Sequence, residues 1–184
     1  DWAFLDQFHL PALDRLSGRV EGALRVAGTT TAPKVTGELV STPLNIHWLH
    51  LDELHGSVYA DSSRLVLGDL RGHQDQLRLE GQLEIPLRLD FLSEPTSPLE
   101  GPFHARVVLP PGSDLAPLTH ATNAFIESHG TGQAEILIDG PLAHPLWRGD
   151  FSVRNGGFVL RDTEEIFHDV SARGRFDGDV LHLE

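Results

Sequence analysis

The fold is decided by one strictly alternating stretch, Gln76-Leu77-Arg78-Leu79-Glu80-Gly81-Gln82-Leu83-Glu84-Ile85. Leucine, glycine and isoleucine take every second position, and charged or amide side chains take the positions between them. Successive side chains of a β-strand point to opposite faces, so a period of two predicts a strand with one apolar and one solvated face.

The same alternation recurs along the chain and predicts about a dozen strands in all. They are expected at residues 20–26, 35–39, 44–48, 54–60, 65–67, 103–109, 136–138, 151–153, 170–176 and 181–183. Short turn signals separate them and indicate antiparallel neighbours, because Gly, Asn and Asp tolerate positive φ. Those signals are Asp61-Ser62-Ser63, Asn155-Gly156-Gly157 and Asp177-Gly178-Asp179.

Two segments are predicted to be helical, residues 1–9 and residues 114–128. The second is expected to begin at Asp114 as N-cap and to end at Gly130 as C-cap. Five of its residues, four of them apolar, share one helical face: Leu115, Leu118, Thr122, Phe125 and Ile126.

A sequence repeat relates the two halves of the chain. Gly28, Pro33 and Gly37 recur in register as Gly140, Pro145 and Gly149, 112 residues later. The register extends upstream, where Gly18, Val20, Gly22, Leu24 and Val26 match Gly130, Gly132, Ala134, Ile136 and Ile138. A fixed period is typical of stacked units rather than of an enzyme pocket. We therefore expect one continuous domain over residues 1–184, with repeat-like units at about 1–92 and 114–184 joined by a loop-rich segment at 93–113.

Composition narrows the class of partner. The 184 residues carry a formal net charge of -13 with Lys34 as the single lysine, and this charge disfavours nucleic acid and anionic membrane surfaces. Neither Cys nor Met is present, so disulfides are excluded and a piece of a longer protein is expected. The sequence contains no apolar run near the roughly 20 residues that a membrane-spanning helix needs, so any anchor is expected outside it.

The apolar side of so many strands must be hidden from water, by a second sheet, by barrel closure or by a ligand. Aromatic residues make up only 7% of the chain, and the apolar positions are mostly Leu, Val and Ile with Gly or Ala between them. Such a surface is smooth and nearly free of hydrogen-bonding groups. It fits either a dry core or an acyl chain, and the residues alone favour the dry core.

The two turns of the form Gly-x(4)-Pro-x(3)-Gly, with their flanking strands, resemble the TamB branch of the AsmA-like proteins. The resemblance runs from Asp1-Trp2-Ala3-Phe4-Leu5 through the first turn, and from Gly132 to Val170 through the second. It implies a mostly β fold, a long and curled antiparallel sheet that forms an open trough with an apolar interior and one or two short helices. It also implies a periplasmic segment of a Gram-negative envelope protein whose inner-membrane anchor lies elsewhere.

The resemblance further implies a function, phospholipid transport between the inner and outer membranes. The expected partners are phospholipid acyl chains and, through other regions, a BamA-like outer-membrane barrel. The acyl chains would contact the alternating apolar set, which comprises Leu24, Val26, Leu39, Ile46, Trp48, Val58, Leu77, Leu79, Leu83, Ile85, Phe103, Val107, Ile136, Ile138, Phe151, Val153, Val170, Phe176 and Leu181. With the resemblance included, a lipid-facing interior is favoured over a dry core.

Two other functional classes stay open. A structural or chaperone module would use an exposed strand edge to assist outer-membrane protein assembly by β-augmentation, and such edges would also pair copies of the chain. A β-helical carbohydrate-active enzyme would require acidic and aromatic residues together on one outer face, which the pattern does not favour.

No catalytic residue, metal site or cofactor is predicted. The densest histidine group is His47, His50 and His55, but residues three apart on a strand point to opposite faces and no Cys supports them. The sequence contains neither a Gly-x-Ser-x-Gly turn nor a phosphate-binding Gly loop before a helix.

Overall fold

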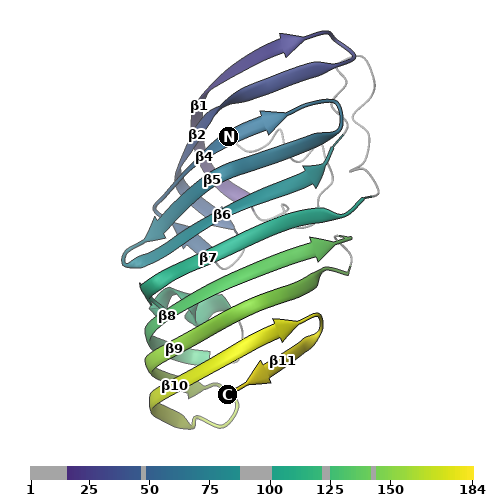
Figure 1. Ribbon diagram of the computed structural model, residues 1–184. Coiled ribbons are helices and arrows are strands. Elements are labelled where there is room, and N and C mark those ends of the chain that lie inside the picture. Colours follow the sequence, from purple (N-terminus) through teal and green to yellow (C-terminus); the bar gives the residue numbers. More distant parts are fainter. Residues whose placement is uncertain (1–15, 47–48, 88–100, 122–124, 142–143) are drawn as a thin grey trace.

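The computed structural model describes residues 16–46, 49–87, 101–121, 125–141 and 144–184. Within these ranges the chain is all β apart from one short 3-10 helix, η3, and it forms a single antiparallel sheet (Figure 1). The elements are β1 Leu16–Gly28, β2 Pro33–Ile46, β3 Leu49–Leu51, β4 Glu53–Ala60, β5 Arg64–Gln74, β6 Leu77–Pro86, β7 Phe103–Asp114, η3 Ala116–Ala121, β8 Phe125–Gly140, β9 Leu146–Leu160, β10 Ile166–Asp177 and β11 Val180–Leu183.

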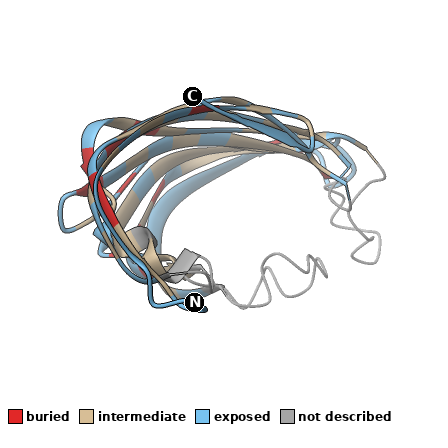
Figure 2. Ribbon diagram, turned by 90° about the horizontal axis from the view of Figure 1, so that it is seen from below, coloured by how far each residue is buried: buried red, intermediate tan, exposed pale blue. Residues whose placement is uncertain are grey.

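The strands follow one another across the sheet in chain order, from β1 at one end to β11 at the other. Only β3 departs from this order, because it pairs with the end of β2 beside β4. Figure 2 shows the sheet bowing round the side on which η3 lies, but the sheet stays open and is not strongly curled. The predicted single antiparallel sheet is confirmed, whereas the strong curling that a trough implies is not observed.

The repeat is also visible in the backbone. Gly28 and Gly140 both have positive φ, at 91° and 105°, and each ends a long strand before the Pro-containing turn. The glycine after each turn, Gly37 or Gly149, lies opposite the equivalent residue of the preceding strand, Leu24 or Ile136. The pair β1 and β2 is therefore equivalent to the pair β8 and β9.

The predicted helix over residues 114–128 is wrong beyond its first turn. Among the described residues of this segment only Ala116–Ala121 is helical, and Phe125 already belongs to β8, where it pairs with Leu160 of β9. Hydrogen bonds connect the helix to that strand, because the backbone N–H of Ser128 donates to Oγ1 of Thr119 at 3.0 Å. Pairing with the 15-residue strand β9 thus overrides the helical pattern. The helix predicted at residues 1–9 lies outside the described residues.

The Asn155-Gly156-Gly157 segment does not form the predicted hairpin turn. These residues lie inside β9, where the pairing with β8 and β10 shifts register and Asn155 adopts a φ of 50°. Positive φ suits a bulge as well as a turn. The other two turn signals do connect strands, β4 to β5 and β10 to β11. Of the segment predicted to be loop-rich, 93–113, residues 103–113 belong to strand β7.

The most buried side chains concentrate where β3 and η3 contact each other over the strand ends. Leu77 at the start of β6 is fully buried, and Leu44 lies opposite Leu51 of β3, with 1% and 3% of their surfaces exposed. The hydroxyl of buried Ser113 donates to the Pro110 carbonyl at 2.7 Å, which satisfies it inside this apolar environment. This region is one dry part of the described sheet, and Pro33, Ala60 and Leu87 are also buried, at the other ends of β2, β4 and β6.

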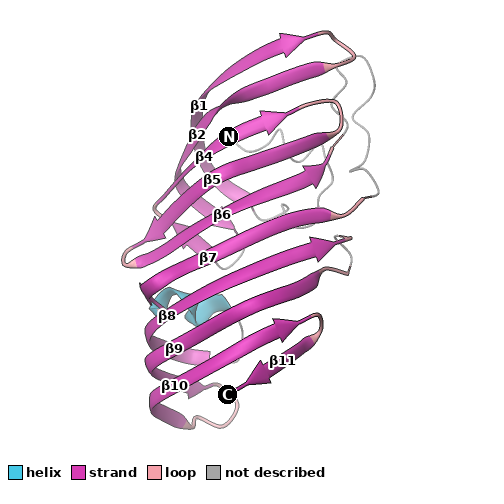
Figure 3. Cartoon of the chain, viewed as in Figure 1, coloured by secondary structure: helices cyan, strands magenta, loops and turns pink. Residues whose placement is uncertain are grey.

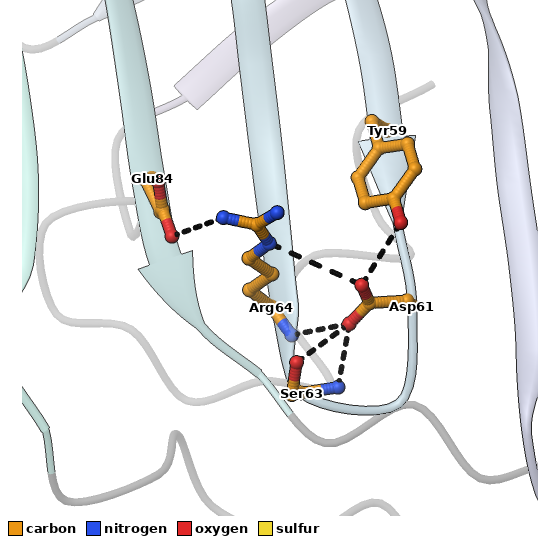
Figure 4. A network of polar contacts seen from close by, with 5 residues as sticks. All are labelled: Tyr59, Asp61, Ser63, Arg64 and Glu84. Atoms are coloured by element: carbon orange, nitrogen blue, oxygen red, sulfur yellow. Dashed lines mark hydrogen bonds and ion pairs between the residues drawn. The ribbon is translucent and has the colours of Figure 1, made fainter.

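A polar network fixes the turn between β4 and β5 (Figure 4). The Asp61 carboxylate accepts hydrogen bonds from the Ser63 hydroxyl at 2.7 Å and from the Ser63 backbone N–H at 2.8 Å. The Tyr59 hydroxyl also donates to it, at 3.0 Å, and Arg64 extends the network to Glu84 on β6 at 3.0 Å. The hydrogen bonds from Ser63 hold the pKa of Asp61 at about 2, below its usual 3.8.

This shift predicts how Asp61→Asn alters the pH dependence of stability. The folded carboxylate has the lower pKa, so its contribution is fully present above pH 3.8 and is lost as the pH falls through about 2. Asp61→Asn should therefore lower the free energy of unfolding by about 1 kcal/mol at pH 6 and by less at pH 3. Urea titrations of both proteins at the two pH values measure this, and an equal difference at both would contradict the assignment.

Candidate apolar binding face

The strand register builds a continuous apolar face across the sheet. Directly opposed residues of antiparallel strands share a face, so each row of partners can be followed from strand to strand. One row runs from β1 to β9 and comprises Leu24, Gly37, Val58, Leu67, Leu83, Ala105, Ile138 and Trp147. Every member is apolar, although these residues come from eight strands. The period of two within each strand and the pairing between strands together place these apolar residues on one face of the sheet.

A neighbouring row reaches the far edge of the sheet. It contains Gly81, Val107, Ile136, Gly149, Phe176 and Leu181, from β6 to β11. The rings of Phe151 and Phe176 lie 5.5 Å apart between centroids and add an aromatic patch to this end of the face.

Large side chains lie over the glycines of this face and fill the space that a glycine side chain leaves empty. A Cβ placed on Gly174 would lie 2.5 Å from two ring atoms of Phe151, and one on Gly56 would lie 2.5 Å from Cδ2 of Leu70. Leu115 covers Gly132 in the same way, with a closest approach of 2.8 Å. Because Leu115 directly precedes η3, η3 lies on the apolar side of the sheet, behind the strands in Figure 3.

The predicted lining residues fall into three groups by exposure. Leu24 and Val26 are 60% exposed, and Val107 and Leu181 are also exposed. Leu39 and Leu77 are buried and belong to the packed part of the sheet. The half-buried members are Val58, Leu79, Leu83, Ile85, Phe103, Ile136, Ile138, Phe151, Val153, Val170 and Phe176.

Two predicted residues cannot be placed on the face in this way. Trp48 lies outside the described residues, and Ile46 is placed only by its backbone pairing, opposite Leu16 of β1 and Leu49 of β3. That the whole set contacts lipid stays a prediction.

Sequence reasoning missed several members of the face. Trp147 is 41% exposed opposite Ile138, and Leu183 is 66% exposed opposite Gly174. Leu67 lies in the first row, opposite Leu83, and Leu65 lies on the same face, opposite Ile85. Trp147 was detectable, because it is the repeat equivalent of Val35 at the 112-residue spacing.

The opposite face is polar and carries ion pairs between neighbouring strands. Arg106 Nη2 of β7 lies 2.8 Å from Glu135 Oε1 of β8, and Arg175 Nε of β10 lies 2.8 Å from Asp150 Oδ1 of β9. Asp150 raises the pKa of Arg175 through the hydrogen bond that it accepts. These exposed pairs contribute little to stability, but they mark this face as the solvated one.

Histidines and carboxylates form a loose chain of contacts around β3, β4 and β5. His55 Nε2 lies 2.9 Å from Glu53 Oε1, while His73 lies 3.8 Å from both Asp52 and Glu53. Among the described residues, no group of three or more His, Cys, Asp or Glu side chains is arranged to hold a metal ion. His47 of the predicted histidine group lies outside those residues.

No protein-family model matches the chain, and neither a curated protein nor a solved structure matches it. In the described part of the chain, no helix has the length and apolarity needed to cross a membrane.

Proposed function

We propose that the apolar face of the sheet shields phospholipid acyl chains from water. In this proposal the chain is a periplasmic segment of an envelope-spanning protein that moves phospholipid between the inner and outer membranes. The resemblance to the TamB branch supports the location, the inner-membrane anchor outside this sequence and a BamA-like barrel as partner of other regions.

One observation carries the proposal, the continuity across ten paired strands of an apolar face whose residues are mostly half-buried or exposed. Within the described ranges only β3 and η3 lie over this face, near one end of the strands. Leu24, Val26, Trp147 and Leu183 therefore expose large apolar surfaces, on one face and on strands as far apart as β1 and β11. A contiguous apolar surface of this extent is a feature of binding sites rather than of a solvated exterior.

The dimensions of the face suit acyl chains. Neighbouring strands lie about 4.8 Å apart, so ten strands span about 43 Å, whereas one leaflet of a bilayer core is about 15 Å thick. Each CH₂ group removed from water contributes roughly 0.8 kcal/mol, which gives binding without any specific polar contact. The two rows carry no polar side chains and therefore offer no single strong site, so a bound chain would slide along them.

A second candidate function, the assistance of outer-membrane protein assembly by β-augmentation, is favoured by one observation. Among the described strands β1 is the last of the sheet on its side, and residues 21–30 are all exposed. Such an edge offers backbone N–H and C=O groups to an incoming strand. A ligand would occupy the edge on this hypothesis and the apolar face on the preferred one.

The first test is native mass spectrometry of the purified protein, with organic extraction to identify lipid that copurifies. The lipid hypothesis predicts stoichiometric phospholipid, released when the protein is denatured. A stable protein free of lipid, which also fails to take up phospholipid from detergent micelles, would reject it and favour the structural or chaperone role.

A further inference from the structure

The outer edge of β1 corresponds to an edge that is occupied elsewhere in the same sheet. Its repeat equivalent β8 pairs with β9 on one side and with β7 on the other. Ile136 of β8 thus has Gly149 opposite it on one side and Val107 on the other, while the equivalent Leu24 has Gly37 opposite it on the β2 side. In the repeat, β1 is therefore equivalent to a strand that has a neighbour on each side.

The sequence of β1 is complementary to itself in antiparallel pairing. If two copies meet with Ala23 opposite Ala23, then Leu24 faces Gly22 of the second copy and Val26 faces Val20. Leu24 opposite a glycine repeats the arrangement that the structure already has between Leu24 and Gly37. The pairing keeps both apolar faces on the same side, because even-numbered residues meet even-numbered residues.

The same register also places opposite charges across from each other. Arg25 would lie opposite Glu21 of the second copy, and the two-fold symmetry produces this pair twice. Glu21 Oε1 is 2.6 Å from Arg19 Nη2 and its side chain is 63% exposed, so its other oxygen is accessible. Within the described part of the chain, the Arg25 guanidinium has no ion-pair partner. Opposite charges directly across an antiparallel pair stabilise it, and like charges destabilise it.

We propose that two copies of this chain pair antiparallel through the outer edges of their β1 strands, centred on Ala23. The pairing joins the two sheets and makes their apolar faces continuous. It uses backbone hydrogen bonds and the residues of β1, so it holds whether or not the apolar face binds lipid.

Charge exchange tests the register by sedimentation equilibrium. The unmodified protein is expected to dimerise, and Glu21→Arg or Arg25→Glu should each weaken dimerisation roughly tenfold or more, because each creates two like-charge pairs. The double variant Glu21→Arg/Arg25→Glu should restore it, and so should an equimolar mixture of the two single variants. Arg154→Glu on β9 is the matched control and should leave dimerisation unchanged.

Cysteine crosslinking provides an independent readout, because the chain has no native Cys. Directly opposed residues of antiparallel strands have Cα atoms about 4.5–5.5 Å apart, within the range for a disulfide. Ala23→Cys should crosslink into a dimer under mild oxidation, whereas Ala27→Cys should not. A monomer at every concentration, or dimerisation that neither the charge reversals nor the position of the Cys affects, would overturn the proposal.

Discussion

Ile138→Asp is expected to remove copurifying phospholipid from the protein. Ile138 lies in the middle of the apolar face, opposite Ala105 on β7 and Trp147 on β9. An acyl chain that crosses this row would have to desolvate the new carboxylate, which costs several kcal/mol without a compensating partner. Lipid per protein, measured by native mass spectrometry, should fall from stoichiometric to background. Leu79→Asp on β6 should have the same effect, since Leu79 faces the same side opposite Gly72.

Leu137→Asp is the matched control for this experiment. Leu137 is the neighbouring residue, 42% exposed on the polar face, where it lies opposite Arg106 and Arg148. It has the same size and the same change in charge, but it does not face the proposed lipid path. Lipid retained by Ile138→Asp, or lost equally from Leu137→Asp, would reject the apolar face as the binding surface. Far-ultraviolet circular dichroism of each variant verifies that the sheet is intact.

Gly149→Ala is expected to give the largest loss of stability of any single methyl addition to the repeat turns. Gly149 has a φ of 138°, and a Cβ there would overlap the backbone carbonyl oxygen of Glu135 on the neighbouring strand. That oxygen belongs to the sheet backbone, so it cannot move aside as a flexible side chain would. Backbone strain and overlap together should lower the free energy of unfolding by about 3 kcal/mol or more.

Gly178→Ala separates the two contributions. Gly178 also has positive φ, at 65°, but no atom lies within 4 Å of the position that its Cβ would occupy. Gly178→Ala should lower the free energy of unfolding by about 1 kcal/mol, because of the backbone conformation alone. Chemical denaturation of both variants measures the difference. Equal losses would show that overlap with Glu135 does not contribute and that the register of β8 and β9 is different.

Local sequence patterns predicted the structure correctly where they fit only one backbone conformation. The alternation at residues 76–85 gives β6, and the turn at Asp61 is fixed by its own hydrogen bonds to Ser63. Where the same local preference fits two structures, prediction failed. Asn155 prefers positive φ in a turn and in a bulge alike, and the apolar residues near Phe125 suit a helix as well as a strand.

For the candidate site, the sequence predicted which residues of each strand share a face, but not which of them stay accessible. Leu77 and Leu79 follow the same alternation, yet Leu77 is fully buried and Leu79 is half-buried. The difference arises because Leu77 lies at the start of β6, toward the strand ends that β3 and η3 cover. The alternation of apolar and polar residues along a strand does not show which of the apolar residues will be covered by elements distant in sequence.

Alternation along the chain and the internal repeat were enough to predict a mostly β chain with one apolar face per strand, because the direction of side chains along a strand is a local property. The order and register of the strands, the bulges within them and the places where the apolar face is covered became known only from the folded chain. These depend on backbone hydrogen bonds between residues far apart in the chain. Those bonds aligned Leu24 of β1 with Trp147 of β9 along one row of an open sheet.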